Sequence, residues 1–236
     1  MGRILSFESK LIETTRNSID VKTFKFSVPK EFSFECGQFV SAKIIIKGEE
    51  LRRAYSIASS PDRKGYIDLC IRKIEGGKGS TYFHNLKKGD KINFIGPMGE
   101  FAKGILEKPN VVFIATGAGI APFRCIVENI LESGYKGKII LFQGKRFIKD
   151  KFFEEEFEYL CEKYPNFEYH LIISRPEFED YQGDKGHVEE LIKKYLPKKI
   201  DADYYLCGLF EMIKETTELL KRLGAPKDRI YRERYD

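Results

Sequence analysis

Two different patterns of hydrophobic and polar positions divide the chain. In roughly the first hundred residues, short stretches rich in β-branched and aromatic residues recur between turns that contain glycine, proline or aspartate. Short strands at regular spacing are typical of a small antiparallel β-barrel. We expect strands at residues 20–28, 37–46, 53–58, 66–74 and 91–95, and one short helix at residues 80–86.

After residue 106, apolar runs alternate with stretches of helical spacing. We expect strands at residues 111–115, 139–143, 168–174 and 203–207, and helices at residues 122–133, 152–163, 187–195 and 210–223. Strand–helix alternation predicts a parallel, Rossmann-like sheet with helices on both faces. The chain is therefore expected to be a β domain over residues 1–106 followed by an α/β domain over residues 107–236.

One stretch of the second domain has the features of an anion site. An apolar strand at residues 111–115 leads through a turn into a helix, and the turn contains Thr116, Gly117, Ala118, Gly119 and Pro122. The glycines let the backbone approach a ligand closely, and the N-terminus of a helix attracts anions. The dinucleotide fingerprint G-x-G-x-x-G is incomplete because its third glycine position holds Pro122. An ordinary strand-to-helix turn therefore stays open as an alternative.

Composition excludes several classes of protein. The chain has 236 residues, of which 42% are hydrophobic and 33% charged, as in ordinary globular proteins. No apolar run is long enough for a membrane helix, and residues 1–10 lack the apolar core of a signal peptide. We therefore expect a cytoplasmic protein without membrane insertion. The net charge of +5 is mild, and no basic run is interleaved with aromatic residues, so nucleic acid is not an expected partner.

The cysteines and histidines do not form a metal-binding pattern. The five cysteines are widely spaced and include no C-x-x-C pair, and the three histidines are scattered. This favours a reducing compartment and predicts no disulfide framework, no zinc site and no iron–sulfur cluster in this chain. Cys36, Cys125 and Cys161 are expected to be buried structural cysteines.

A tetrapeptide in the first domain carries groups that could bind a flavin. Arg53, Tyr55 and Ser56 supply a cation, a flat aromatic ring and a hydroxyl at the end of a strand. Such groups can pair with a phosphate, cover an isoalloxazine face and hydrogen-bond the edge of a flavin. Taken alone, the tetrapeptide is about as compatible with a plain edge strand.

The order of several motifs resembles the ferredoxin–NADP reductase family over nearly the whole chain. The motifs lie at residues 53–61, 69–73, 79–81, 96–99, 116–124, 205–209 and 233–235. The resemblance implies FAD in the first domain. Arg53 would bind its pyrophosphate, Tyr55 would lie against the flavin, and Ser56 would lie near flavin N5. Further FAD residues implied by the resemblance are Cys70, Ile71 and Arg72 on a strand, and Gly79, Ser80 and Thr81 at a helix start.

The same resemblance implies a nicotinamide nucleotide in the second domain. Residues 116–122 would hold its pyrophosphate, and Cys207, with Gly208 and Leu209, would lie beside the nicotinamide. Ser174 and Arg175 suit a ribose 2′-phosphate, and residues 145–146 add positive charge, which favours NADPH. NADH stays open, because the sequence after Arg175 is also similar to that of some NADH-dependent reductases.

The C-terminus completes the implied site. In the family pattern, the terminal aromatic residue lies on the flavin, which assigns Tyr235 to FAD, and Glu233 serves in a proton path with Ser56. Asp236 is one residue more than the pattern has, and this puts the packing of the tail in question. Ser56, Cys207 and Glu233 are the implied catalytic residues.

The resemblance implies a ferredoxin– or flavodoxin–NADP reductase. Hydride would pass between NADPH and FAD, and single electrons between FAD and a small acidic carrier, ferredoxin or flavodoxin. The enzymatic alternative is an NADH-dependent flavin reductase, or a reductase component of an oxygenase or electron-transfer system that uses a separate iron–sulfur partner. A flavin-binding subunit of a larger complex is a further alternative. FAD rather than FMN depends on the resemblance alone.

Overall fold

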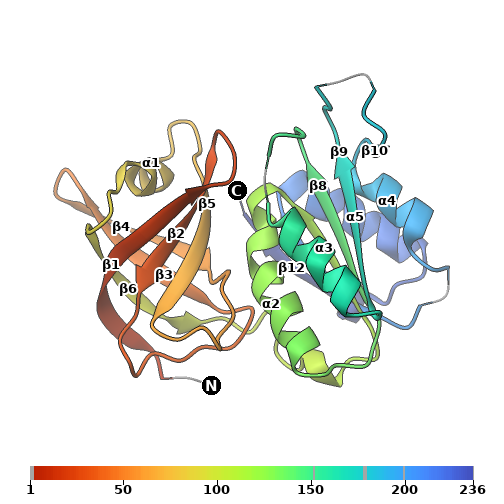
Figure 1. Cartoon of the computed structure of the whole chain (residues 1–236), viewed down its shortest axis with the longest axis horizontal. Coiled ribbons are helices and arrows are strands. Elements are labelled where there is room, and N and C mark those ends of the chain that lie inside the picture. Colours follow the sequence, from red (N-terminus) through yellow and green to blue (C-terminus); the bar gives the residue numbers. More distant parts are fainter. Residues whose placement is uncertain (1–2, 151, 178–179, 199, 236) are drawn as a thin grey trace. The chain divides into compact units, whose positions relative to one another are not determined.

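The computed structural model describes residues 3–150, 152–177, 180–198 and 200–235 (Figure 1). The chain forms two compact units. The first comprises Met1–Lys103 and Arg124–Asn129, and the second comprises Gly104–Phe123 and Ile130–Asp236. The expected domain boundary after residue 106 stays a prediction. Asp236, whose role the sequence left in question, lies outside the described residues.

The first unit is an antiparallel half-barrel. Its six strands lie in the order β4-β3-β6-β1-β2-β5, and every pair is antiparallel. The β character expected for this part of the chain is confirmed. The strands are β1 (Leu5–Arg16), β2 (Val21–Ser27), β3 (Phe39–Ile46), β4 (Glu49–Ser56), β5 (Tyr66–Arg72) and β6 (Lys91–Met98).

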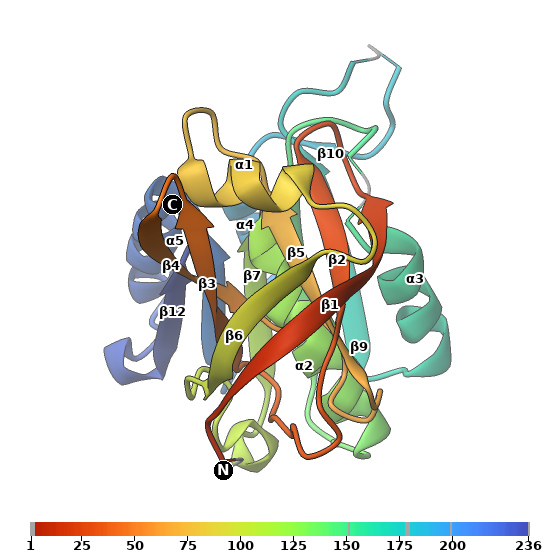
Figure 2. The same cartoon turned by 90° about the vertical axis from the view of Figure 1, so that its left-hand side faces the viewer.

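A cluster of aromatic rings fills the half-barrel and anchors helix α1 (Lys78–Asn85). Phe83 of α1 is fully buried and packs edge-on against Phe24 and Phe26 of β2, with ring centroids 5.8 and 6.0 Å apart. Phe26 also packs against Phe94 of β6 at 5.2 Å. These contacts fix α1 at one end of the strands (Figure 2).

The second unit is a parallel α/β sheet. The strand order is β10-β9-β8-β7-β11-β12, and all five neighbouring pairs are parallel. The strands are β7 (Val111–Thr116), β8 (Ile139–Lys145), β9 (Phe167–Ile173), β10 (Asp184–Lys185), β11 (Asp203–Gly208) and β12 (Ile230–Arg234). The fold class expected from the sequence is therefore confirmed.

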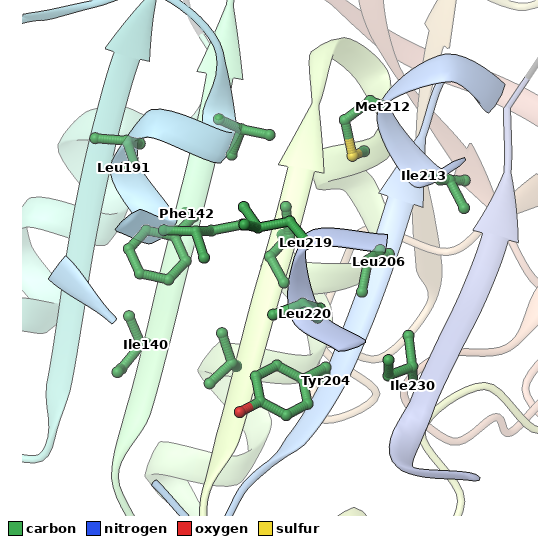
Figure 3. Close-up of a cluster of buried hydrophobic side chains, with 14 of the residues drawn as sticks. Ile140, Phe142, Leu191, Tyr204, Leu206, Met212, Ile213, Leu219, Leu220 and Ile230 are labelled. Carbon is green, nitrogen blue, oxygen red and sulfur yellow. The ribbon is translucent and has the colours of Figure 1, made fainter. Parts of the chain in front are cut away.

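Helices cover both faces of this sheet. Alternate strand residues such as Phe142 and Leu206 pack under α4 (Val188–Tyr195) and α5 (Phe210–Arg222), with Leu191 and Leu220 completing that core (Figure 3). The opposite face packs against α2 (Ala121–Glu132) and α3 (Glu154–Lys163). Short 3-10 helices complete the chain at Ile105–Glu107, Gly117–Ile120 and Lys227–Arg229. Within the described parts of the chain, no helix is both long and apolar enough to cross a membrane.

Sequence patterning missed three strands: β1, β10 and β12. In β1 the inward positions are Phe7, Ser9 and Leu11, and the buried Ser9 breaks the apolar alternation because its hydroxyl donates to the Ser27 carbonyl. A bulge after Leu11 then shifts the register. Strand β12 is mostly charged and is defined by its pairing with β11. Strand β10 has only two residues.

Substitution of Phe83 tests whether the aromatic cluster holds α1 in place. We expect Phe83→Ala to lower the free energy of unfolding by about 3–5 kcal/mol, because it leaves a cavity between α1 and β2. The control is Ile45→Ala on β3, where the side chain is 62% exposed and the loss should stay within about 0.5 kcal/mol. Urea unfolding measures both values. Equal losses in the two variants would contradict this packing.

Candidate functional site

Strand β4 presents the expected flavin residues of the first unit at its end. Ser56 is buried and pairs in register with Phe39 of β3. Tyr55 packs edge-on against Phe83, with ring centroids 4.7 Å apart. Burial raises the pKa of Tyr55, so its phenol stays protonated and can donate a hydrogen bond at any physiological pH.

The N-terminus of α1 lies beside Arg53. A Cβ added to Gly79 would lie 3.0 Å from Cγ of Arg53 and 3.6 Å from the Tyr55 hydroxyl oxygen. Gly77 caps the helix without a side-chain hydrogen bond, and the first N–H groups of a helix have no acceptor within the helix. Together with the Arg53 guanidinium, these donors have the chemistry expected of an anion site.

Ser80 and Thr81 stabilise that helix start. The Ser80 hydroxyl accepts a hydrogen bond from the Ile74 backbone N–H at 3.0 Å and donates to the Gly77 carbonyl at 3.3 Å. The Thr81 backbone N–H donates to the same carbonyl at 3.0 Å. The Ser80 hydroxyl hydrogen and the Thr81 N–H are thus both bonded within the helix start, so neither is available to a ligand.

Strand β5 carries three further expected flavin residues. Cys70 and Ile71 are buried, and the Ile71 carbonyl lies 3.0 Å from Nε2 of His84 on α1. Arg72 forms an ion pair with Asp20, with Nε 2.7 Å from Oδ2. The structure thus places β4, β5 and the start of α1 in one neighbourhood of the first unit.

Sequence reasoning missed a buried carboxylate on β5. Asp68 is 4% exposed, and its Oδ2 lies 3.1 Å from Nη1 of Arg124 within the first unit. Burial raises the pKa of Asp68, although Arg124 opposes the shift. The sequence places this aspartate between Ile67 and Leu69, and such alternation is typical of a strand with one face in solvent. It could not show that both faces of β5 are buried.

The glycine turn of the second unit follows β7. Gly117 has φ of +54°, and no heavy atom lies within 4 Å of the place where its Cβ would be, so the backbone is open on that side. At Gly119 a Cβ would collide with the Cys207 carbonyl, so only glycine allows the turn to touch β11. The Thr116 hydroxyl oxygen is buried and has no hydrogen-bond partner among the described residues.

The end of β11 brings the other predicted nicotinamide residues to the same sheet edge. Cys207 is buried and pairs in register with Glu233 of β12. The Tyr235 backbone N–H donates to the Gly208 carbonyl at 2.9 Å. Burial, reinforced by the negative charge of Glu233, raises the pKa of Cys207 far above its usual range, so this cysteine is a neutral thiol. Leu209 follows and is exposed.

The ends of β8 and β9 carry the residues expected at a 2′-phosphate. The Ser174 N–H donates to the Lys145 carbonyl at 3.0 Å, and the Arg175 N–H donates to the Arg146 carbonyl at 2.8 Å. Arg146 and Arg175 are exposed neighbours. The charge expected from Lys145 is not available to a ligand, because its ammonium is buried and bonded to Glu154 and to the Asp150 carbonyl.

Each unit therefore carries groups whose chemistry suits one cofactor. In the first, an uncapped helix start, Arg53 and the Tyr55 ring suit a flavin with its phosphates. In the second, an open glycine turn and the unpartnered Thr116 hydroxyl suit a nucleotide pyrophosphate. Both assignments depend on hydrogen-bond donors and positive charge that suit phosphate groups. No cluster of histidine, cysteine and acidic side chains able to hold a metal ion occurs in the described part of the chain.

Comparisons with known proteins agree with this division. Residues 8–102 match the oxidoreductase FAD-binding domain, and residues 113–218 match the oxidoreductase NAD-binding domain. Ferredoxin–NADP reductase B of Sorangium cellulosum is 33% identical over 98% of this chain and 98% of its own length. Phenol hydroxylase P5 protein of Acinetobacter pittii is 32% identical over 98% of this chain, which spans 66% of that protein.

A solved structure shows the same fold. The ferredoxin–NADP reductase of Neisseria gonorrhoeae with bound FAD and NADP superposes with a TM-score of 0.85 over 97% of this chain and 98% of its own, at 23% identity. The two domain matches define an FAD- and NAD(P)-binding oxidoreductase. The chain belongs to the ferredoxin–NADP reductase family.

The Thr116 hydroxyl offers a direct test of the nucleotide site. We expect Thr116→Val to weaken NADP⁺ binding about 3- to 10-fold, because a ligand hydrogen bond is lost. The melting temperature should be unchanged or slightly higher, since replacing an unpartnered buried hydroxyl by a methyl group removes a desolvation cost. Calorimetric titration and thermal unfolding measure the two effects.

Thr217→Val is the matched control, since the Thr217 hydroxyl donates to the Ile213 carbonyl within α5. That variant should bind NADP⁺ like the wild type. Unchanged binding in Thr116→Val would remove this hydroxyl from the site.

Proposed function

We propose that the protein is a ferredoxin– or flavodoxin–NADP reductase that binds FAD in the first unit and NADPH in the second. When both cofactors are bound, they supply the redox chemistry, which is hydride exchange between nicotinamide C4 and flavin N5. The protein contributes binding, orientation and the placement of protons. The family and the two domain matches support this proposal.

In the first unit, Arg53 and the N–H groups at the start of α1 bind the flavin pyrophosphate. Tyr55 lies against the flavin, and Ser56 hydrogen-bonds near N5. Cys70, Ile71 and Arg72 border the flavin along β5. Ser56 is buried, and the phenol of Tyr55 stays protonated. Both groups are therefore neutral hydrogen-bond donors, which supports these roles.

In the second unit, residues 116–119 and Pro122 bind the nucleotide pyrophosphate at the start of α2. Cys207 packs beside the nicotinamide as a neutral thiol, so its role is to position the ring and not to act as a nucleophile. Gly208 and Leu209 continue that wall. Glu233, in register with Cys207, holds the proton that the cycle exchanges with solvent. The assignment of Tyr235 to the flavin stays a prediction.

The preference for NADPH depends mainly on one observation. Arg146 and Arg175 are exposed, follow neighbouring strand ends, and are joined by a 2.8 Å backbone hydrogen bond. Two guanidinium groups with the Ser174 hydroxyl suit the dianionic 2′-phosphate of NADPH. The 2′-hydroxyl of NADH is instead typically bound by a carboxylate.

A small acidic electron carrier is the proposed partner. The protein has a net charge of +5, which favours encounters with an acidic protein. The Sorangium cellulosum relative, matched over 98% of its length, is named a ferredoxin–NADP reductase. An NADH-dependent reductase that serves an oxygenase through a separate iron–sulfur protein is the second candidate, favoured by the similarity to phenol hydroxylase P5 protein.

Substitution of Arg175 tests the coenzyme assignment. We expect Arg175→Gln to lower kcat/KM for NADPH about 10- to 100-fold, because a charge-assisted contact to the 2′-phosphate is lost. The value for NADH should change less than about 2-fold, since NADH lacks that phosphate. Steady-state reduction of ferricyanide under both coenzymes gives the ratio.

Arg222→Gln is the control, because Arg222 is an exposed arginine on α5, and both kcat/KM values should stay as in the wild type. A wild-type preference for NADH, with Arg175→Gln indistinguishable from Arg222→Gln, would contradict the NADPH assignment and favour the second candidate.

Reduction of added ferredoxin or flavodoxin at rates well above those with free FMN tests the partner separately.

A further inference from the structure

Two cysteines that are far apart in the sequence are in direct contact in the first unit. Sγ of Cys36 and Sγ of Cys125 lie 2.7 Å apart, although the residues are 89 positions apart in the chain. Cys36 Sγ also lies 3.2 Å from the Cys125 carbonyl oxygen. An S–S bond has a length of about 2.05 Å, so the two sulfur atoms are within a small displacement of bonding distance.

The surroundings hold Cys36 in this position. It lies in the turn before β3, where the Gln38 side-chain carbonyl accepts from the Glu35 N–H at 2.8 Å and the Gln38 side-chain amide donates to the Gly99 carbonyl at 3.2 Å. Cys125 is fully buried on α2. Cys36 is partly exposed, so a small oxidant reaches the pair through Cys36.

From this contact we propose that Cys36 and Cys125 are an oxidisable dithiol that forms an intramolecular disulfide with a small-molecule disulfide as oxidant. The Cys36 thiolate attacks the oxidant, forms a mixed disulfide and releases one small thiol. Cys125 then loses its proton, attacks the Cys36 sulfur and releases the second small thiol. Two protein thiols are oxidised while one disulfide is reduced to two thiols.

Two properties of the pair determine how it behaves. The hydrogen bond to Cys125, followed by burial, raises the pKa of Cys36, so little thiolate is present at neutral pH and the exchange is slow. Once formed, the bond closes a long loop, and this restricts the unfolded chain and stabilises the folded protein. The cross-link is therefore expected to act on stability and to be independent of the coenzyme preference.

The test uses the full-length flavoprotein, incubated with oxidised glutathione and then assayed under denaturing conditions. We expect the number of free thiols to fall from five to three and mass spectrometry to find one linked peptide pair containing Cys36 and Cys125. The melting temperature should rise by roughly 5–15 °C and return when dithiothreitol is added.

Three variants make the assignment specific. Cys36→Ser and Cys125→Ser should form no internal disulfide and show no reversible rise in melting temperature. Cys161→Ser, which changes a partly exposed cysteine on α3, should still lose two thiols and gain stability. Retention of all five thiols in the wild type, a link through another cysteine, or disulfide-linked dimers would overturn the proposal.

Discussion

The parallel direction of all six strands is the constraint on which the second unit depends. In a parallel sheet every strand ends at the same edge, so residues far apart in the chain meet there. The turn after β7, the two arginines after β8 and β9, and Cys207 at the end of β11 all share this edge. Gly119 shows how tightly the constraint acts, because the turn touches the Cys207 carbonyl and leaves no room for a Cβ.

In the first unit a packing contact has the corresponding role. The antiparallel strands provide the end of β4, but the anion-binding groups also require the start of α1 beside Arg53. Phe83 fixes α1 by inserting its ring among the barrel aromatics, and the same ring supports Tyr55. Core packing and the candidate flavin site therefore depend on one side chain, so loss of that packing should disturb cofactor binding as well as stability.

Most helices and strands could be predicted, because their apolar spacing and turn residues lie within the element itself or directly beside it. The apolar run at residues 111–115 and the glycine turn after it indicated strand, turn and helix without knowledge of the rest of the chain. Strand β12 could not be found in this way, since Tyr231, Arg232 and Glu233 form a strand only because β11 provides an edge for pairing. The same holds for β1, where Ser9 points inward and is satisfied by Ser27 of a neighbouring strand.

The site residues show the same division. Local residue types singled out the motif at residues 53–56 and the turn at residues 116–122, and their proposed roles come from the family resemblance. The partners of Lys145 and Asp68 were not, because each depends on a second segment. Lys145 forms a buried ion pair with Glu154, so Arg146 is the cation available to a ligand after β8. Arg124 forms an ion pair with Asp68. The contact between Cys36 and Cys125 is likewise a property of the tertiary fold and has no signature in the spacing of the cysteines.

A chain that binds both a flavin and a nicotinamide nucleotide should reduce its own flavin. The most direct measurement is an anaerobic titration of the purified protein with NADPH and, separately, with NADH, followed by the visible absorbance of oxidised flavin. We expect a yellow protein whose flavin is bleached rapidly by NADPH and slowly by NADH. A colourless protein that takes up no added FAD, or a flavin that neither coenzyme reduces, would contradict it.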